Sequence, residues 1–410
     1  MASLLTRALL VLVCGFAALS SSAAVALGLA EERVLVFTGL LLALLALPLL
    51  SRPALARPSG PALLLALLLA GIVVTDVGGI FDPVDAKVAL PVLVLLAGPN
   101  LARQMTPAEL TRFVWRLLSF YVAVTFLYQV VAEPAVVARG HEGIVRYDPT
   151  GSVVMHSSLS LIHLVLAVTR LGERQPLRAR LATLALGGMS LSMVFLTATR
   201  TALLTLALLA VLTLLVSPEP HRAARRLAMA ALGFGLAFAA WTALVDDSFY
   251  LRLTGGQEDF TSGRWSSVRH WLALAGEHPW GMGLGAAREL LADGRPALDG
   301  TKLLECPHNE LVRFYLEAGP PGLLFVLLLL AVLLRRALRA AAREDDPERR
   351  MLILAIAADL VAEACLQNLL NAVYHATVLI LVLILAVALA GREDVGRAAR
   401  PGQAPAPMPC

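Results

Sequence analysis

Charged residues are scarce in this sequence. Only 16% of the 410 residues are Asp, Glu, Lys or Arg, whereas a soluble domain carries about 25%. Hydrophobic residues make up 58% of the chain, and the mean hydropathy is +0.75. This composition supplies too little polar surface for a soluble enzyme of this length, and it is too apolar for a disordered chain. A polytopic membrane protein is the class that remains.

Cysteines and clustered basic residues are scarce as well. The chain has four cysteines, and no two have the spacing of a zinc knuckle or of a disulfide framework. The formal net charge is only +4, and the basic residues are scattered over short loops. We therefore expect no nucleic-acid partner and no structural zinc site.

Long apolar runs are what the sequence does contain. A helix that crosses a bilayer needs about 20 mostly apolar residues. Twelve segments approach that requirement, namely 8–28, 34–50, 61–75, 84–98, 113–132, 152–169, 181–197, 199–216, 227–245, 321–338, 351–372 and 374–390. Segment 8–28 also resembles a signal peptide, but no soluble domain follows it, which favours a retained helix. The predicted fold is an all-α polytopic membrane protein with about twelve transmembrane helices.

Basic residues indicate the orientation, because short cytoplasmic loops are enriched in Lys and Arg. With the N-terminus inside, the inner segments carry 21 arginines and the short outer loops carry five basic residues. We therefore expect both termini in the cytoplasm. Four regions follow: nine membrane helices in 1–245, an outer loop in 246–320, three membrane helices in 321–390, and a disordered cytoplasmic tail in 391–410.

The outer loop is too long, at 75 residues, to be a bare connection. Residues 264–277 and 308–318 have helical periodicity, and prolines and glycines separate them. Three residues on this side of the membrane invite a functional interpretation: Arg200, Arg264 and His308. Taken singly, Arg200 could snorkel, Arg264 could pair with a nearby carboxylate, and His308 could cap a helix.

Several motifs, taken in order, resemble the superfamily of O-antigen ligases and O-antigen polymerases. They are Thr-Arg at 199–200, Ser-Gly-Arg-Trp at 262–265, HPWGMGLG at 278–285, His-Asn at 308–309 and Glu-Ala-Gly at 317–319. The resemblance covers roughly residues 190–335. It rests on the order of the motifs around one long outer loop, since no single motif is specific.

The resemblance implies a glycosyltransferase of the bacterial inner membrane whose active site is periplasmic. Its donor would be a glycan linked to undecaprenyl diphosphate, transfer would invert the sugar carbon, and no metal or cofactor would be needed. Arg200 and Arg264 would bind the donor diphosphate, and His308 would be the catalytic base. We also expect Asn309 to contact substrate or to orient His308, and Glu310 is an alternative orienting residue.

This assignment is chemically reasonable. A lipid diphosphate is a good leaving group that needs charge neutralisation, which guanidinium groups supply without a metal. A sugar hydroxyl is a poor nucleophile until a base removes its proton, and histidine titrates near neutral pH.

A polar stripe marks the segment 351–372. Asp359, Glu363, Gln367, Asn371 and His375 recur every four residues, which predicts one helical face turned to the bundle interior or to a water-filled cavity. The stripe could line a glycan or acceptor path, relay protons, or join helices through hydrogen bonds. For His156 and His163 we favour a structural role. We expect the glycines at 281, 283 and 285 to permit a tight loop, and Trp265, Trp271 and Trp280 to anchor loop helices at the membrane interface.

Three functions remain open at this stage. An O-antigen ligase would join the glycan to a lipid A–core acceptor, whereas a polysaccharide polymerase would extend one lipid-linked chain with another. The single long loop favours the ligase. A transporter without chemistry is the alternative from another class, although the sequence shows no inverted repeat.

Overall fold

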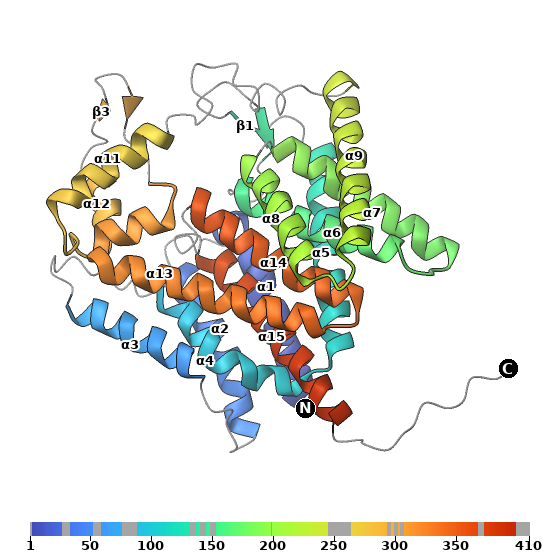
Figure 1. Ribbon diagram of the computed structural model, residues 1–410, viewed down its shortest axis with the longest axis horizontal. Helices are drawn as coiled ribbons and strands as arrows, with labels where there is room; N and C mark the ends of the chain where they lie inside the picture. Colours follow the sequence, from blue (N-terminus) through green and yellow to red (C-terminus); the bar gives the residue numbers. More distant parts are fainter. Residues whose placement is uncertain are drawn as a thin grey trace.

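The computed structural model is a bundle of helices with smaller elements gathered toward one end (Figure 1). It describes residues 2–26, 33–51, 59–75, 88–131, 137–139, 145–147, 153–197, 199–244, 264–292, 297–298, 302–303, 307–367 and 373–398.

Within these ranges, helices coincide with all twelve predicted apolar segments. They are α1 (Ala2–Ala26), α2 (Arg33–Ser51), α3 (Gly60–Val74), α4 (Leu90–Leu101), α5 (Pro107–Val131), α6 (Val153–Leu171), α7 (Leu177–Thr197), α8 (Arg200–Val216), α9 (Pro220–Leu244), α13 (Glu310–Arg343), α14 (Pro347–Leu366) and α15 (Val373–Ala398). The beginning of segment 84–98 lies outside the described residues.

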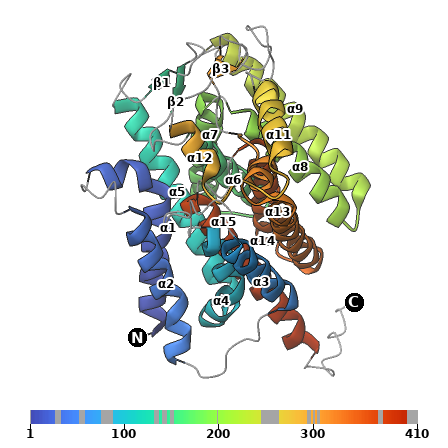
Figure 2. The same cartoon turned by 90° about the vertical axis from the view of Figure 1, so that its left-hand side faces the viewer.

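The smaller elements belong mainly to the predicted outer loops. They are α11 (Arg264–Glu277), α12 (Ala286–Ala292), the antiparallel pair β1 (Val137–Arg139) and β2 (Val145–Tyr147), the antiparallel pair β3 (Ala297–Leu298) and β4 (Lys302–Leu303), and the 3-10 helix η2 (Ala102–Gln104). The strands and α11 and α12 lie toward the top of Figure 2, and the N-terminus lies toward the bottom. The fold is therefore helical, as predicted, with two short hairpins in addition.

Five of the described helices are long and apolar enough to cross a membrane: α5, α6, α7, α9 and α13. Shorter apolar stretches lie in α1, α2, α3, α8 and α15. The chain is thus a membrane protein with several apolar helices, and the count of twelve spans stays a prediction. Helix α9 supports a lipid environment most directly, because none of its residues is buried and it packs along α8 (Figure 1).

Helix α14 is the central helix of the bundle. It contacts α6, α8, α13 and α15, and most of its residues are buried. Asp346 caps its beginning by accepting hydrogen bonds from the backbone N–H groups of Glu348 and Arg349, and Pro347 follows the cap. Alanines dominate its middle turns, which lets four neighbouring helices approach closely.

Contacts between helix ends that lie far apart in the sequence agree with the predicted threading of the chain. Arg7 pairs with Glu109 at 2.5 Å, and Arg170 pairs with Glu348 at 2.6 Å. Each pair joins two segments that the charge pattern assigns to the cytoplasmic side. At the opposite side of the predicted membrane, Ser157 and Thr199 share a hydrogen bond of 2.6 Å. Ser157 lies near the beginning of α6 and Thr199 directly before α8, and both helix ends are next to predicted outer loops. The alternation of helix ends is therefore consistent with the prediction, and which end faces the cytoplasm stays a prediction.

Helix α13 consists of two helical parts separated by a kink with a non-helical backbone at Ala318 and Gly319, which agrees with the predicted boundary between the helix 308–318 and the span that begins at 321. Two other boundaries differ from the prediction. Helix α15 continues to Ala398, so the part of the predicted disordered tail up to that residue is helical, and 399–410 lie outside the described residues. Helix α14 ends at Leu366 rather than at 372.

Candidate functional site

Arg200 is the first residue of α8, directly after the tight turn that follows α7. Its side chain is half-buried, whereas its neighbours Thr199 and Thr201 are buried. The Thr199 hydroxyl shares a hydrogen bond with Ser157 of α6, and the Gln367 amide donates to the Thr201 hydroxyl at 3.2 Å. Hydrogen bonds to α6 and to the end of α14 therefore fix the turn that carries Arg200.

His308 lies in the short stretch before α13 and has an unusual backbone. Its φ of 43° is in the left-handed region, which costs a residue other than glycine about 1–3 kcal/mol and is found mostly where the surroundings impose it. Buried Pro307 precedes it and Asn309 follows it. Strain of this kind clusters at functional positions, and here it coincides with a residue that the motifs singled out.

Asn309 fixes the position of His308. Its side-chain oxygen accepts hydrogen bonds from the N–H groups of Leu311 and Val312 at 3.0 and 3.1 Å, so Asn309 and not His308 caps the helix. Its amide group donates to the backbone carbonyl of Cys365 at 3.0 Å. Both polar groups of Asn309 are thus engaged, and the expectation that it also contacts substrate stays a prediction.

The end of α14 connects these two parts of the chain. Cys365 binds the residue after His308, and Gln367, two residues further on, binds the residue after Arg200. The structure therefore brings the neighbourhoods of Arg200 and His308 to the same short stretch of α14.

A buried ionic network that the sequence-based predictions did not include follows His308 in the first turns of α13. Arg313 lies 3.1 Å from Glu310 and 3.2 Å from Glu317, and the three side chains are almost fully buried. Helical spacing of three and four residues between opposite charges is a signal that could have identified the network. Glu310 pairs with Arg313, so its carboxylate belongs to this network.

The glycine-rich loop 278–285 packs against the kink of α13. The N–H groups of Met282 and Gly283 each donate at 2.9 Å, to the carbonyls of Leu316 and Glu317 respectively. Gly281 and Gly319 both have positive φ, and their backbones approach so closely that a side chain at either position would collide with the other segment. Two of the motifs that resemble the superfamily, HPWGMGLG and Glu-Ala-Gly, therefore pack directly against each other, an arrangement that we call the interlock. The predicted tight loop is confirmed.

Arg264 begins α11, as the predicted helix 264–277 requires, and its side chain lies outside the described residues. Helix α11 packs on α13 through Trp271, which is fully buried against Val312 and Leu316. The expectation that Trp271 anchors at the membrane interface is therefore wrong, because the indole fills the core between α11, α12 and α13. Trp280 is 73% exposed, and Trp265 lies outside the residues whose side chains are described.

The predicted polar stripe is divided between two helices. Asp359 and Glu363 lie on α14, whereas His375 lies on α15, and Asn371 lies outside the described residues. The prediction of a single helical face is therefore wrong for His375. The three ionisable groups nevertheless converge in the bundle interior, where their ligand-type atoms lie within 4.8 Å of one another.

The two histidines of α6 join helices, as expected. His156 shares a hydrogen bond of 2.8 Å with Tyr121, and His163 lies between Ser119 and Ser190 at 3.0 and 2.6 Å.

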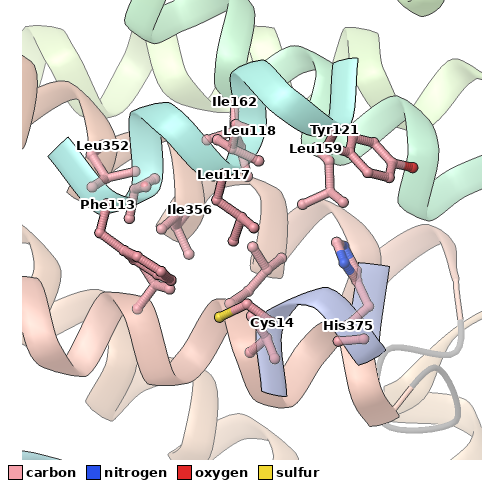
Figure 3. Close-up of a pocket in the computed structure, with 15 residues that line it drawn as sticks. Cys14, Phe113, Leu117, Leu118, Tyr121, Leu159, Ile162, Leu352, Ile356 and His375 are labelled. Atoms are coloured by element: carbon pink, nitrogen blue, oxygen red, sulfur yellow. The ribbon is translucent and has the colours of Figure 1, made fainter. Parts of the chain in front are cut away.

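An internal cavity of about 50 Å³ lies between α1, α5, α6, α14 and α15 (Figure 3). Its walls are mostly aliphatic and aromatic, with His375 on one side. Ligand pockets usually measure about 300–1,000 Å³, so this cavity is too small for a sugar chain.

These features define a polytopic helical membrane protein in which several sequence motifs pack together around the beginning of one helix, α13. A family model described as O-antigen ligase matches residues 184–327, the region from within α7 to within α13 that carries these motifs. This match confirms the resemblance to the O-antigen ligase superfamily over roughly a third of the chain. No curated protein matches the sequence at a significant level.

Proposed function

We propose that the protein transfers a glycan from a polyprenyl-diphosphate carrier to a sugar hydroxyl at the outer leaflet, with lipid A–core as the acceptor. The superfamily supports membrane glycosyl transfer of the ligase or polymerase type. The observation that carries the proposal is that one end of α14 binds both the residue after Arg200 and the residue after His308.

In this proposal Arg200 and Arg264 bind the donor diphosphate. A guanidinium stays charged at every physiological pH and donates two parallel hydrogen bonds to phosphate oxygens. Negative charge grows on the diphosphate as the glycosidic bond breaks, so these contacts strengthen toward the transition state in a medium of low dielectric. The reaction then needs no metal and no cofactor at the diphosphate.

His308 acts as the general base. It removes the proton from the acceptor hydroxyl as the hydroxyl attacks the sugar carbon from the side opposite the leaving diphosphate, which inverts that carbon. Its imposed backbone conformation supports this role, because a base must be held in place before the substrate arrives.

The buried groups around His308 make its position rigid. Asn309 fixes the beginning of α13, and Arg313 neutralises Glu310 and Glu317 in the first turns. The glycine-rich loop is bonded to the end of the same turns. We infer that these elements form a scaffold for an active site on the periplasmic face of the inner membrane, with both chain termini in the cytoplasm.

One incubation tests the proposal. Purified protein in nanodiscs receives a diphosphate-linked glycan and a lipid A–core acceptor, and the products are separated by size and by acceptor label. Product on the acceptor supports the ligase, a longer lipid-linked chain supports the polymerase instead, and no product with correctly folded protein overturns the enzymatic proposal in favour of a transporter.

A further inference from the structure

We propose that Asp359, Glu363 and His375 form a buried site for one divalent transition-metal cation at the junction of α6, α8, α14 and α15. The site would stabilise the bundle and would take no part in glycosyl transfer.

The three side chains converge in a place that solvent does not reach. One ligand atom from each lies within 4.8 Å of the others, and the residues are 1%, 2% and 4% exposed. The Oε1 atom of Glu363 accepts no hydrogen bond among the described residues, and the Nε2 atom of His375 lies 3.2 Å from it. The close partner of this oxygen is therefore another proposed ligand, and a cation between them would take the place of that contact.

Two hydroxyl groups orient Asp359. Ser158 of α6 and Thr205 of α8 donate hydrogen bonds to the two oxygens of Asp359, the second at 3.2 Å. The Ser158 hydroxyl also lies 3.1 Å from Nε2 of His375. Metal ligands are commonly held by such partners, which fix the rotamer of each ligand before the ion binds.

The charge of the cluster favours a divalent ion. Among the described residues Glu363 pairs with His375, and no lysine or arginine forms an ion pair with Asp359 or Glu363. A divalent cation bound by both carboxylates would supply positive charge where no basic side chain of these residues does.

The ligand set favours a transition metal over Mg²⁺ or Ca²⁺. Two carboxylates and one imidazole suit Zn²⁺, Mn²⁺ or Fe²⁺, whereas Mg²⁺ and Ca²⁺ prefer oxygen ligands throughout. Bonds of about 2.0–2.2 Å require the three ligand atoms to move closer when the ion binds, and the cavity beside His375 gives its ring room to adjust (Figure 3).

The site would join helices that position the turn of Arg200. Glu363 lies one helical turn before Gln367, which donates to Thr201 at the beginning of α8. A cation held by α14 and α15 would therefore strengthen the part of the bundle to which α8 is attached.

Metal binding can be measured without any glycan. Full-length protein without a histidine tag is purified in detergent, treated with a chelator, and exposed separately to Zn²⁺, Mn²⁺ and Mg²⁺. Mass spectrometry of the elements gives the number of ions per chain, and intrinsic fluorescence gives the Tm. We expect one Zn²⁺ or Mn²⁺ ion per chain and a Tm that rises with its concentration, and no such response to Mg²⁺.

Matched glutamate variants decide whether the ion is at this site. Glu363→Gln should weaken binding by about a hundredfold or more and abolish the rise in Tm. Glu348→Gln changes a buried glutamate at the other end of α14, paired with Arg170, and should bind as the wild type does. If Glu363→Gln does not accumulate, Asp359→Asn takes its place. Wild-type protein that binds no transition metal, or a Glu363→Gln variant that binds it normally, overturns the proposal whether or not the protein transfers glycans.

Discussion

The side-chain amide of Asn309 donates a hydrogen bond to the backbone carbonyl of Cys365, 3.0 Å away. The two residues are 56 positions apart, and the bond attaches the beginning of α13 to the last turn of α14. Since the side-chain oxygen of the same asparagine caps α13, one residue sets both the start of the helix and its place in the bundle. His308 precedes this anchor directly, so its position depends on a contact that lies far away in the sequence.

Asn309→Asp should separate the two tasks of this residue. The aspartate keeps an oxygen to cap α13 but presents a carboxylate to the Cys365 carbonyl, which removes the bond to α14. We expect kcat for glycan transfer to fall about tenfold to a hundredfold with KM little changed, because a small displacement of a base slows the chemical step. Steady-state kinetics on purified protein measure both constants. A rise in KM at constant kcat would instead mean that Asn309 binds substrate, as the sequence analysis expected.

His308→Asn should abolish transfer without unfolding the protein. Asparagine tolerates a positive φ and retains a polar side chain, but it cannot accept a proton at neutral pH. We expect a loss of about 10²- to 10⁴-fold in kcat, the usual contribution of a general base. The amount of inserted protein and its Tm serve as the control. Activity within a few-fold of wild type would exclude His308 as the base.

Lysine at Arg200 or at Arg264 should be a poor replacement. The ammonium group keeps the charge but cannot donate the two parallel hydrogen bonds of a guanidinium, so we expect transfer to fall by about a hundredfold in each variant. Arg222→Lys is the matched control, since Arg222 is exposed and pairs only with Glu219 among the described residues. Full activity of both Arg200→Lys and Arg264→Lys would contradict a diphosphate clamp.

The sequence predicted where the helices lie along the chain better than which segments each helix contacts. Apolar length alone located every predicted segment on a helix, because a run of that kind has few alternatives in a bilayer. The periodicity of the polar stripe failed at Gln367, where the backbone becomes extended at φ −142° and ψ 177°. No proline or glycine marks that end. It coincides with the contact between Gln367 and Thr201, which is a tertiary interaction that a local pattern does not contain.

At the candidate site, too, the sequence indicated individual residues better than their tertiary contacts. The motifs indicated Arg200, Arg264 and His308, whereas the cap of α13 is Asn309 and not His308, the residue that the sequence suggested for that role. The ion pairs of Arg313 with Glu310 and Glu317 have the three- and four-residue spacing of a helix, so the sequence contained a signal for them that the predictions did not use. The local sequence does not indicate that Trp271 is a core residue, because α12 and α13 as well as α11 surround its side chain.

Gly281→Ala should disrupt the interlock between the glycine-rich loop and α13. The residue has φ +92°, and a methyl group there would lie 2.5 Å from the Glu317 carbonyl oxygen. The conformation alone costs about 1–2 kcal/mol for a residue with a side chain, and the collision adds to it. We expect faster proteolysis of the loop and loss of transfer, with membrane insertion unchanged. Gly276→Ala, where a methyl group meets nothing within 4 Å, should behave as the wild type does.

The orientation of the bundle is open to a direct test by cysteine labelling. Ala273 on α11 and Ala224 near the start of α9 are both exposed, and the charge pattern assigns them to opposite sides of the membrane. In a chain whose four cysteines are replaced by serine, Ala273→Cys should react in intact cells with a thiol reagent that does not cross the inner membrane. Ala224→Cys should react only after the membrane is opened, because the arginines around it favour the cytoplasm. The reverse result would place α11 and the beginning of α13 in the cytoplasm, where an outer-leaflet donor could not reach His308, and the proposed reaction would fail on topology alone.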